Sequence, residues 1–208
     1  MGKGRGSRRT ETYDKELGDA VAKAQRGDET AFSAAYRTVH PPLLGYLRGL
    51  VGDDAEDVAS DAWLEIARDL GRFRGDGAGF RAWTARIARN RAIDHLRRLK
   101  SRPRGTTLAG ELAELPARQD TAEEALEIVT TRQALALIAE LPRQQAEAVL
   151  LQTVIGLDGP AAARVLGKRQ GAVRSATHRG LKRLEKRLLS LGRDRVTDSD
   201  SSPLGESR

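Results

Sequence analysis

The sequence of 208 residues contains no cysteine and only three histidines. The absence of cysteine excludes disulfides, thiolate metal sites, iron–sulfur clusters and cysteine nucleophiles. His40, His95 and His178 are far apart along the chain, so no metal site can form from local spacing. We therefore expect neither a metal ion nor another cofactor.

Long apolar runs are also missing. No stretch approaches the roughly 18 uncharged apolar residues of a membrane-spanning helix. The basic N-terminus is not followed by the apolar segment of a secretory signal. Hydrophobic residues make up 39% of the chain and charged residues 31%, which predicts small cores and a large wetted surface. These features exclude a membrane protein and favour a cytoplasmic location.

Signatures of catalysis are absent as well. The glycine-containing run 75–79 is neither preceded by a strand nor followed by Lys-Ser/Thr, so it is not a phosphate-binding loop. The acidic clusters at 53–57 and 120–127 are typical of helix starts and solvated faces. We therefore expect no enzymatic activity.

Positive charge is what the chain has in excess. Its 36 Lys and Arg residues against 29 Asp and Glu residues give a net charge of +7, and the pI near 10.1 favours a polyanionic partner. Residues 80–104 and 164–187 each carry nine basic residues and one acidic residue, whereas residues 105–130 carry six acidic residues and one arginine. This pattern predicts two nucleic-acid contacts on one chain. The alternative is that both basic blocks are solvated helix faces.

Helical periodicity dominates the sequence, and no convincing strand signal interrupts it. We predict an all-α fold with two small helical domains joined by a flexible linker, the second domain containing a helix-turn-helix. The linker segment carries two prolines and two glycines and no sustained period. The predicted boundaries are a disordered basic arm over 1–13, a first domain over 14–100, the linker over 101–120, a second domain over 121–191 and a disordered tail over 192–208.

Local signals mark the ends of helices in the first domain. The pair Pro41–Pro42 is expected to interrupt a helix that begins at Asp28, and Gly52 is expected to close the piece that follows. Asp53 and Asp54 can then cap the next helix. A further helix is expected to begin near Phe80.

Residues 80–100 combine an anchoring face with a cationic face. At about 100° per residue, Phe80, Trp83 and Ile87 fall together. Another side carries Arg86, Arg89, Arg97 and Lys100, with Asn90 at the rim. Such a helix can pack by its aromatic face, present cations to phosphates and place one amide against a base edge. The alternatives are a core role for Trp83 and a surface or capping role for Asn90.

Residues 159–188 predict a helix-turn-helix. A short helix over about 159–166 is followed by a turn in which Gly167 can adopt a positive φ, and then by a basic amphipathic helix over 170–188. Its apolar arc is expected to consist of Val173, Thr177, Leu181, Leu184 and Leu188. Its polar face supplies the base-edge candidates Gln170, Arg174, Ser175 and His178. For His178, a DNA-facing or solvated role is favoured over metal binding.

Three stretches with distinctive motifs follow one another along the chain. They are AEDVASDAW at 55–63, the pieces FRGD, FRAW and IARN within 73–90, and LPRQQ at 141–145 followed by GAVRS at 171–175. These are similar to the patterns A-E-D-x-x-Q-E-x-F, W-x-x-x-I-A-x-N, and L-P-x-x-x-R with G-T-V-[KR]-S-R. By their order and spacing, the chain resembles an extracytoplasmic-function (ECF) sigma factor of bacterial RNA polymerase, in the sigma-70 family, from about residue 17 to 190.

The resemblance implies an RNA polymerase sigma factor that directs transcription initiation. The first domain would bind the β′ clamp helices of core polymerase and capture the −10 promoter element as single-stranded DNA. The second domain would read the −35 element as duplex DNA. The linker would enter the active-site channel of the polymerase. Because such factors are often held by an anti-sigma factor, the resemblance also implies one as a candidate partner.

Candidate residues follow from the matching positions and the helix faces described above. The candidates for polymerase binding are Asp57, Ser60 and Asp61. The candidates for −10 binding are Arg74, Phe80, Trp83, Arg86, Asn90 and Arg97. The candidates for −35 binding are Gln170, Arg174, Ser175, His178, Arg179 and Lys182.

The chain departs from the family pattern at three places. Ser60-Asp61 replaces the Gln-Glu pair, residues 158–163 lack the glutamate of the usual S-x-x-E-I-A helix, and Ala176 replaces an arginine. These changes bear on the polymerase contact and on −35 affinity.

The alternative function is a stand-alone helix-turn-helix regulator. Such a regulator would need neither the helix over 80–100 nor the segment around Asp57. Duplex binding by the free chain would favour it.

Overall fold

The structure, a computed structural model, describes residues 4–101 and 133–199. This part of the chain contains helices and no strand, which confirms the predicted all-α class. None of the described helices combines the length and the apolar character that crossing a bilayer requires. The elements are α1 (Gly4–Ala24), α2 (Glu29–Val51), η1 (Gly52–Asp54), α3 (Ala55–Asp69), η2 (Leu70–Arg72), α4 (Gly77–Ser101), α6 (Arg143–Thr153), α7 (Gly159–Leu166) and α8 (Gln170–Ser199).

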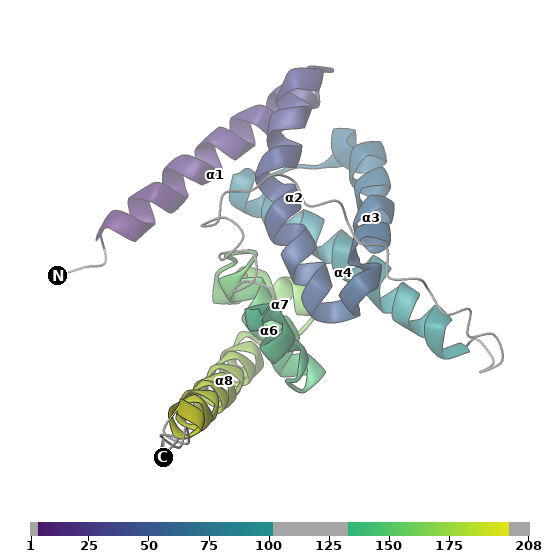
Figure 1. Ribbon diagram of the computed structural model, residues 1–208. Helices are drawn as coiled ribbons and strands as arrows, with labels where there is room; N and C mark the ends of the chain where they lie inside the picture. The colour runs from purple at the N-terminus through teal and green to yellow at the C-terminus, as the bar shows by residue number, and fades with distance from the viewer. Residues whose placement is uncertain (1–3, 102–132, 200–208) are drawn as a thin grey trace, which may run out of the picture.

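The helices form two units (Figure 1). In the N-terminal unit, residues 4–101, α1 packs on α2 and α4, and α3 packs on the same two helices. In the C-terminal unit, residues 133–199, α6 and α7 pack against the first half of α8, whose second half extends away from the rest of the molecule. The largest fully buried side chains include Tyr46, Leu47, Ile66 and Phe80 in the first unit and Leu150 in the second.

Helix α2 continues through Pro41 and Pro42, so the predicted interruption is wrong. A proline lacks the N–H group that would bond to the carbonyl four residues earlier, which leaves the Thr38 carbonyl without its intrahelical partner. The Tyr13 hydroxyl of α1 donates a hydrogen bond to this carbonyl at 3.3 Å. Packing of α1 on α2 therefore satisfies an acceptor that the prolines expose.

Described helix extends into both segments that were predicted to be disordered. Helix α1 begins at Gly4, so the predicted disorder is wrong for residues 4–13, and Leu17 and Val21 anchor this helix in the core. Helix α8 continues to Ser199, so residues 192–199 are helical where a disordered tail was predicted. No proline interrupts the sequence between Leu188 and Ser199, and an established helix propagates easily through such a run. The predicted linker lies outside the described residues, apart from Ser101.

The turn between α2 and α3 differs in detail from the prediction. Gly52 ends α2 with a positive φ of 64°, as expected. Asp54 precedes α3, but its side chain makes no capping bond, because its φ of −75° and ψ of 4° are not the extended geometry of a cap. Its carboxylate instead lies 2.8 Å from Nε2 of His95 on α4. This contact joins the start of α3 to α4.

An aromatic cluster fixes α3 against α2. The Trp63 indole N–H donates a hydrogen bond to Nδ1 of His40 at 3.1 Å, and the Tyr36 ring stacks on His40 at 4.7 Å between centroids. Partial burial lowers the pKa of His40, with Glu56 acting in the opposite direction and Arg48 reinforcing the shift. The acceptor role of Nδ1 requires the neutral imidazole, so the cluster depends on an unprotonated His40.

Acidification should weaken the N-terminal unit through His40. The pKa of His40 is lower in the folded than in the unfolded chain. The stability that neutral His40 contributes is therefore fully present above pH 6.5 and is lost as the pH falls below that value. The variant His40→Asn keeps an acceptor for Trp63 and removes the titration. Urea unfolding followed by tryptophan fluorescence at pH 7.5 and 5.5 should show a larger loss of stability in the wild type than in His40→Asn. Equal losses would contradict this account.

Candidate nucleic-acid interface

Helix α4 begins one turn earlier than predicted, at Gly77, because Asp76 caps it. The Asp76 carboxylate accepts a hydrogen bond from the Gly79 N–H at 2.8 Å. The first turn of α4 lies directly against α1. A Cβ atom at Gly77 would come within 2.0 Å of the Asp14 carbonyl oxygen, so only glycine fits at this crossing.

Phe80 lies in the core and not on the surface of α4. Its side chain is 1% exposed and packs against Phe73 and Trp83, with ring centroids 5.3 and 5.6 Å away. The prediction that Phe80 contacts DNA is therefore corrected, because its ring has no surface to offer. Trp83 is only partly buried and forms the accessible edge of this aromatic group.

Arg74 stabilises the loop before α4. Its Nη1 donates hydrogen bonds to the carbonyl oxygens of Gly71 and Phe73 at 2.8 and 2.7 Å. These bonds close the turn between η2 and α4. The predicted −10 contact of Arg74 would require the guanidinium to leave these carbonyls.

The exposed face of α4 carries a smaller set of polar groups than its sequence offers. Arg86, Asn90 and Arg97 are exposed, as predicted. Arg97 forms an exposed ion pair with Asp94 at 3.3 Å, which is a weak constraint. Arg89, expected on the same face, is instead bonded to Glu147 of α6. The accessible face of α4 therefore includes Arg86, Asn90, Arg97 and Lys100 beside Trp83.

A second exposed group of residues lies on α3. Asp57, Ser60 and Asp61 are exposed, and they share a helix face with Leu64, whose exposure is 72%. We call these four residues the α3 stripe. The opposite face of α3, with Val58, Ala62 and Ile66, is buried. Sequence reasoning missed Leu64, although its position three residues after Asp61 placed a large apolar side chain on the polar face.

Helix α7 of the helix-turn-helix has the predicted bounds, and α8 begins where the sequence predicts it but ends later. The Asp158 carboxylate caps α7 by accepting a hydrogen bond from the Ala161 N–H at 2.7 Å. Gly167 ends α7 in the left-handed conformation, with φ of 63° and ψ of 37°, and its N–H bonds to carbonyls of the last turn. Helix α8 then begins at Gln170.

One face of α8 carries all the residues predicted to contact the −35 element. The exposed side chains are Gln170, Arg174, Ser175, His178, Arg179 and Lys182, and we call this set the recognition face. Val173, Ala176 and Thr177 are buried on the opposite side. The predicted apolar arc is only partly buried, since Leu181 and Leu188 are 46% and 56% exposed where α8 leaves the unit.

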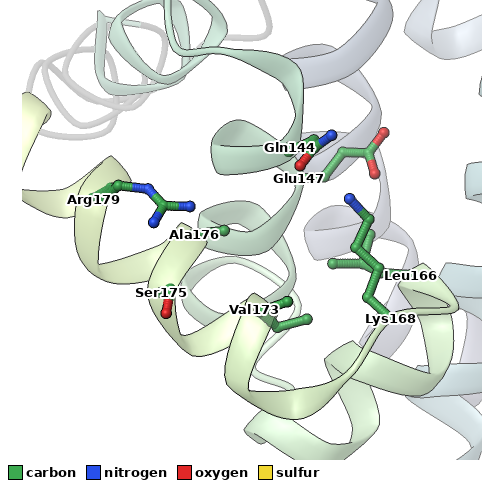
Figure 2. Close-up of a pocket in the computed structure, with 9 residues that line it drawn as sticks. Gln144, Glu147, Leu166, Lys168, Val173, Ser175, Ala176 and Arg179 are labelled. Atoms are coloured by element: carbon green, nitrogen blue, oxygen red, sulfur yellow. The ribbon is translucent and has the colours of Figure 1, made fainter.

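A small pocket of 250 Å³ lies beside the recognition face. Figure 2 shows Ser175 and Arg179 of α8 on one side and Gln144, Glu147 and Lys168 on the other. Within residues 4–101 and 133–199, no group of three or more His, Asp or Glu side chains could hold a metal ion.

Comparisons with known proteins identify the same two units. The family described as Sigma-70 region 2 matches residues 35–102, and the family described as Sigma-70, region 4 matches residues 131–184. The first match contains α3 and α4, and the second contains the helix-turn-helix.

Relatives with similar sequences carry the name ECF RNA polymerase sigma factor. The chain is 32% identical to BldN of Streptomyces coelicolor, over 82% of this chain and 65% of BldN. It is 32% identical to ShbA of Streptomyces griseus, over 81% of this chain and 93% of ShbA. It is also 32% identical to SigD of Mycobacterium tuberculosis, over 85% of each chain.

Solved structures share the fold. CnrH in complex with the cytosolic domain of CnrY aligns with a TM-score of 0.56 and 24% identity, over 91% of this chain and 99% of that chain. RpoE in complex with the anti-sigma factor NepR from Bartonella quintana aligns with a TM-score of 0.57 and 23% identity, over 76% of this chain and 96% of that chain. These similarities concern the arrangement of helices.

Removal of the α7 cap should destabilise the helix-turn-helix. Asp158→Ala leaves the Ala161 N–H without its acceptor, and loss of such a cap costs about 1 kcal/mol. Asp158→Asn retains an oxygen acceptor and serves as the matched control. Urea unfolding followed by circular dichroism should give a lower midpoint for Asp158→Ala than for Asp158→Asn. Coincident curves for the two variants would show that the cap contributes nothing.

Proposed function

The chain belongs to the ECF branch of the sigma-70 family of RNA polymerase sigma factors. On that premise we propose which step of transcription initiation each of three helices performs. In this proposal α3 binds core polymerase, α4 captures the −10 element and α8 reads the −35 element. The observation that carries the proposal is that three separate helices each expose one group of suitable side chains.

The α3 stripe suits a protein partner. Leu64 is a large apolar side chain held in water by a helix whose other face is fully anchored in the core. Around it, Asp57 and Asp61 supply negative charge that would complement a basic surface. A buried apolar anchor with a charged surround is the usual make-up of a protein interface, so we assign the β′ clamp helices of core polymerase to this stripe.

The exposed face of α4 suits an unpaired DNA strand. Arg86 and Arg97 are placed to meet phosphates, and Asn90 between them offers both a donor and an acceptor to a base edge. The partly exposed Trp83 is backed by the buried Phe80, so it forms a firm surface for an unstacked base. Phe80 thus supports −10 capture without touching the DNA.

The recognition face of α8 suits the major groove of a duplex. Arg174 and Gln170 lie near the start of the helix, where a helix-turn-helix approaches base edges. Arg179 and Lys182 follow further along α8 and are placed to meet the phosphate backbone. An anti-sigma partner remains a prediction of the family resemblance.

The direct test is gel filtration of the full chain with bacterial core RNA polymerase, followed by transcription from a promoter library. Co-elution with promoter-specific transcripts is expected, and the transcripts would define both recognition elements. Duplex binding by the free chain without polymerase association would instead identify a stand-alone regulator.

Replacement of Asn90 should impair promoter opening and leave polymerase binding intact. Asn90→Ala removes the amide assigned to a base, and such a contact contributes about 1–3 kcal/mol, so opening should fall roughly tenfold or more. Open-complex formation is measured by permanganate footprinting, and co-elution of the same variant with core polymerase is the internal control. Unchanged opening would contradict the assignment.

Replacement of Leu64 should weaken the binding of core polymerase, which Asn90→Ala leaves intact. Leu64→Ala removes most of an apolar anchor worth about 1.5–3 kcal/mol when buried, so affinity for core polymerase should fall about tenfold. Asp57→Arg should also weaken association, through reversal of charge. The control is Leu189→Ala, which removes a leucine 62% exposed on α8, outside the stripe. Equal affinities for Leu64→Ala and Leu189→Ala, measured by fluorescence anisotropy, would exclude the stripe as the binding site.

A further inference from the structure

The pocket beside the recognition face is open because small residues form much of its apolar lining. This lining consists of Ala172, Val173 and Ala176 of α8 and Leu166 at the end of α7. Ala176 stands where the family pattern has an arginine, so no long side chain from that position fills the space. The volume of 250 Å³ is several times the roughly 30 Å³ that one water molecule occupies in the liquid. The pocket therefore has room for a small polyatomic group.

Cationic side chains reach the pocket from two sides. Figure 2 shows the ammonium group of Lys168 and the guanidinium group of Arg179 directed toward the same space beside Ala176. Ser175 and Gln144 also line the pocket, and each carries a hydrogen-bond donor. Within residues 4–101 and 133–199, the side chains of Gln144, Lys168, Ser175 and Arg179 make no hydrogen bond or ion pair. Their donors are therefore available to a ligand.

The acidic side chain in the lining, that of Glu147, is already paired. Its Oε2 accepts hydrogen bonds from Nε and Nη2 of Arg89 at 3.0 and 2.9 Å, and its Oε1 accepts from Nε of Arg143 at 2.9 Å. Two guanidinium groups thus compensate one carboxylate. Lys168 and Arg179 then leave an excess of positive charge around the pocket, and this charge favours an anion as the ligand.

The local fold positions these donors before a ligand arrives. Lys168 follows Gly167 in the turn between α7 and α8, and its main-chain N–H donates a hydrogen bond to the Ala163 carbonyl oxygen at 3.0 Å. This bond fixes the backbone of Lys168 while its side chain stays exposed. Gln144 lies in the first turn of α6, and Arg179 lies on α8. Because the donors are carried by two helices and a tight turn, a ligand has little backbone to order when it binds.

We propose that this pocket binds one phosphate group. Lys168 and Arg179 pair with its negative charge, and Gln144 and Ser175 donate hydrogen bonds to its oxygens. A phosphate suits the pocket better than a carboxylate does, because the donors come from several sides. The oxygens of a phosphate point to the corners of a tetrahedron, whereas the two oxygens of a carboxylate lie in one plane.

Two sources can supply this phosphate group. One is the backbone of the −35 duplex, which would enter the pocket while Gln170 and Arg174 face base edges; this source rests on the proposed function. The other is a free phosphorylated molecule, which would occupy the same place and exclude the DNA backbone from it. Both sources use the same four side chains, so one set of variants tests both.

Binding to the free chain is tested by titration with inorganic phosphate at constant ionic strength, followed by the amide signals in NMR spectra. Saturable shifts are expected at residues 144–147 and 166–179. Lys168→Gln should weaken this binding about tenfold, the loss expected for one charge-assisted hydrogen bond. The matched control Lys23→Gln removes the same charge from an exposed position on α1 and should change nothing. Ala176→Leu fills the pocket and should abolish binding, with its folding verified by circular dichroism.

The DNA source is tested with the complex of the full chain and core polymerase on a promoter duplex at several salt concentrations. Each phosphate contact contributes about 0.9 to the slope of log affinity against log salt concentration, so Lys168→Gln should reduce that slope by about 0.9 and Lys23→Gln should leave it unchanged. Neutral methylphosphonate linkages, placed one at a time in the −35 region, then identify the phosphate. At one position, the loss of affinity seen with the wild type should be absent with Lys168→Gln.

The two experiments separate the sources and the proposals. A reduced slope with one such position assigns the pocket to the −35 backbone, and an unchanged slope with saturable binding by the free chain assigns it to a free phosphorylated molecule. An unchanged slope without saturable binding, or equal behaviour of Lys168→Gln and Lys23→Gln in both assays, would overturn the phosphate site. If the wild-type complex binds no promoter, the proposed function fails, and the phosphate titration still tests the pocket.

Discussion

The arrangement of the described helices depends on one buried carboxylate, that of Glu147. A carboxylate that is 4% exposed is stable only when cations and hydrogen-bond donors surround it, and here the donors come from both units. Arg143 belongs to the same helix and is always within reach, whereas Arg89 reaches Glu147 only when α4 and α6 are adjacent. Since α6 also packs on α8, the position of this carboxylate couples the recognition face to α4.

Helix α1 completes the arrangement from the opposite side. It supplies the Asp14 carboxylate that orients Arg81, and the Tyr13 hydroxyl that satisfies a carbonyl exposed by the prolines of α2. Its close crossing with α4 requires glycine at position 77. The N-terminal segment thus contacts both neighbours: it satisfies a carbonyl of α2, and it holds the guanidinium that contacts the turn after α6.

Features set by neighbouring residues in the sequence could be predicted, and those set by distant residues could not. The helix-turn-helix is determined by the Asp158 cap and the left-handed Gly167, which depend only on residues in adjacent turns. The recognition face follows from helical period alone. By contrast, the burial of Phe80 depends on Phe73 and the core around it, and the withdrawal of Arg89 from the cationic face depends on Glu147, 58 residues away. The hydrogen bond to the Thr38 carbonyl beside the prolines of α2 comes from Tyr13 of α1, and Leu64 became a candidate only when its exposure was known.

The most direct test of the account is the distance between the two units in solution, with and without polymerase. Because the chain has no cysteine, spin labels can be attached at Glu29→Cys in α2 and Glu185→Cys in α8, two exposed positions outside the binding faces. Pulsed electron paramagnetic resonance should give one narrow distance distribution for the free chain. In the complex with core polymerase and promoter DNA, that distribution should shift to longer distances. The same distance in both states, or a broad distribution in the free chain, would contradict the account.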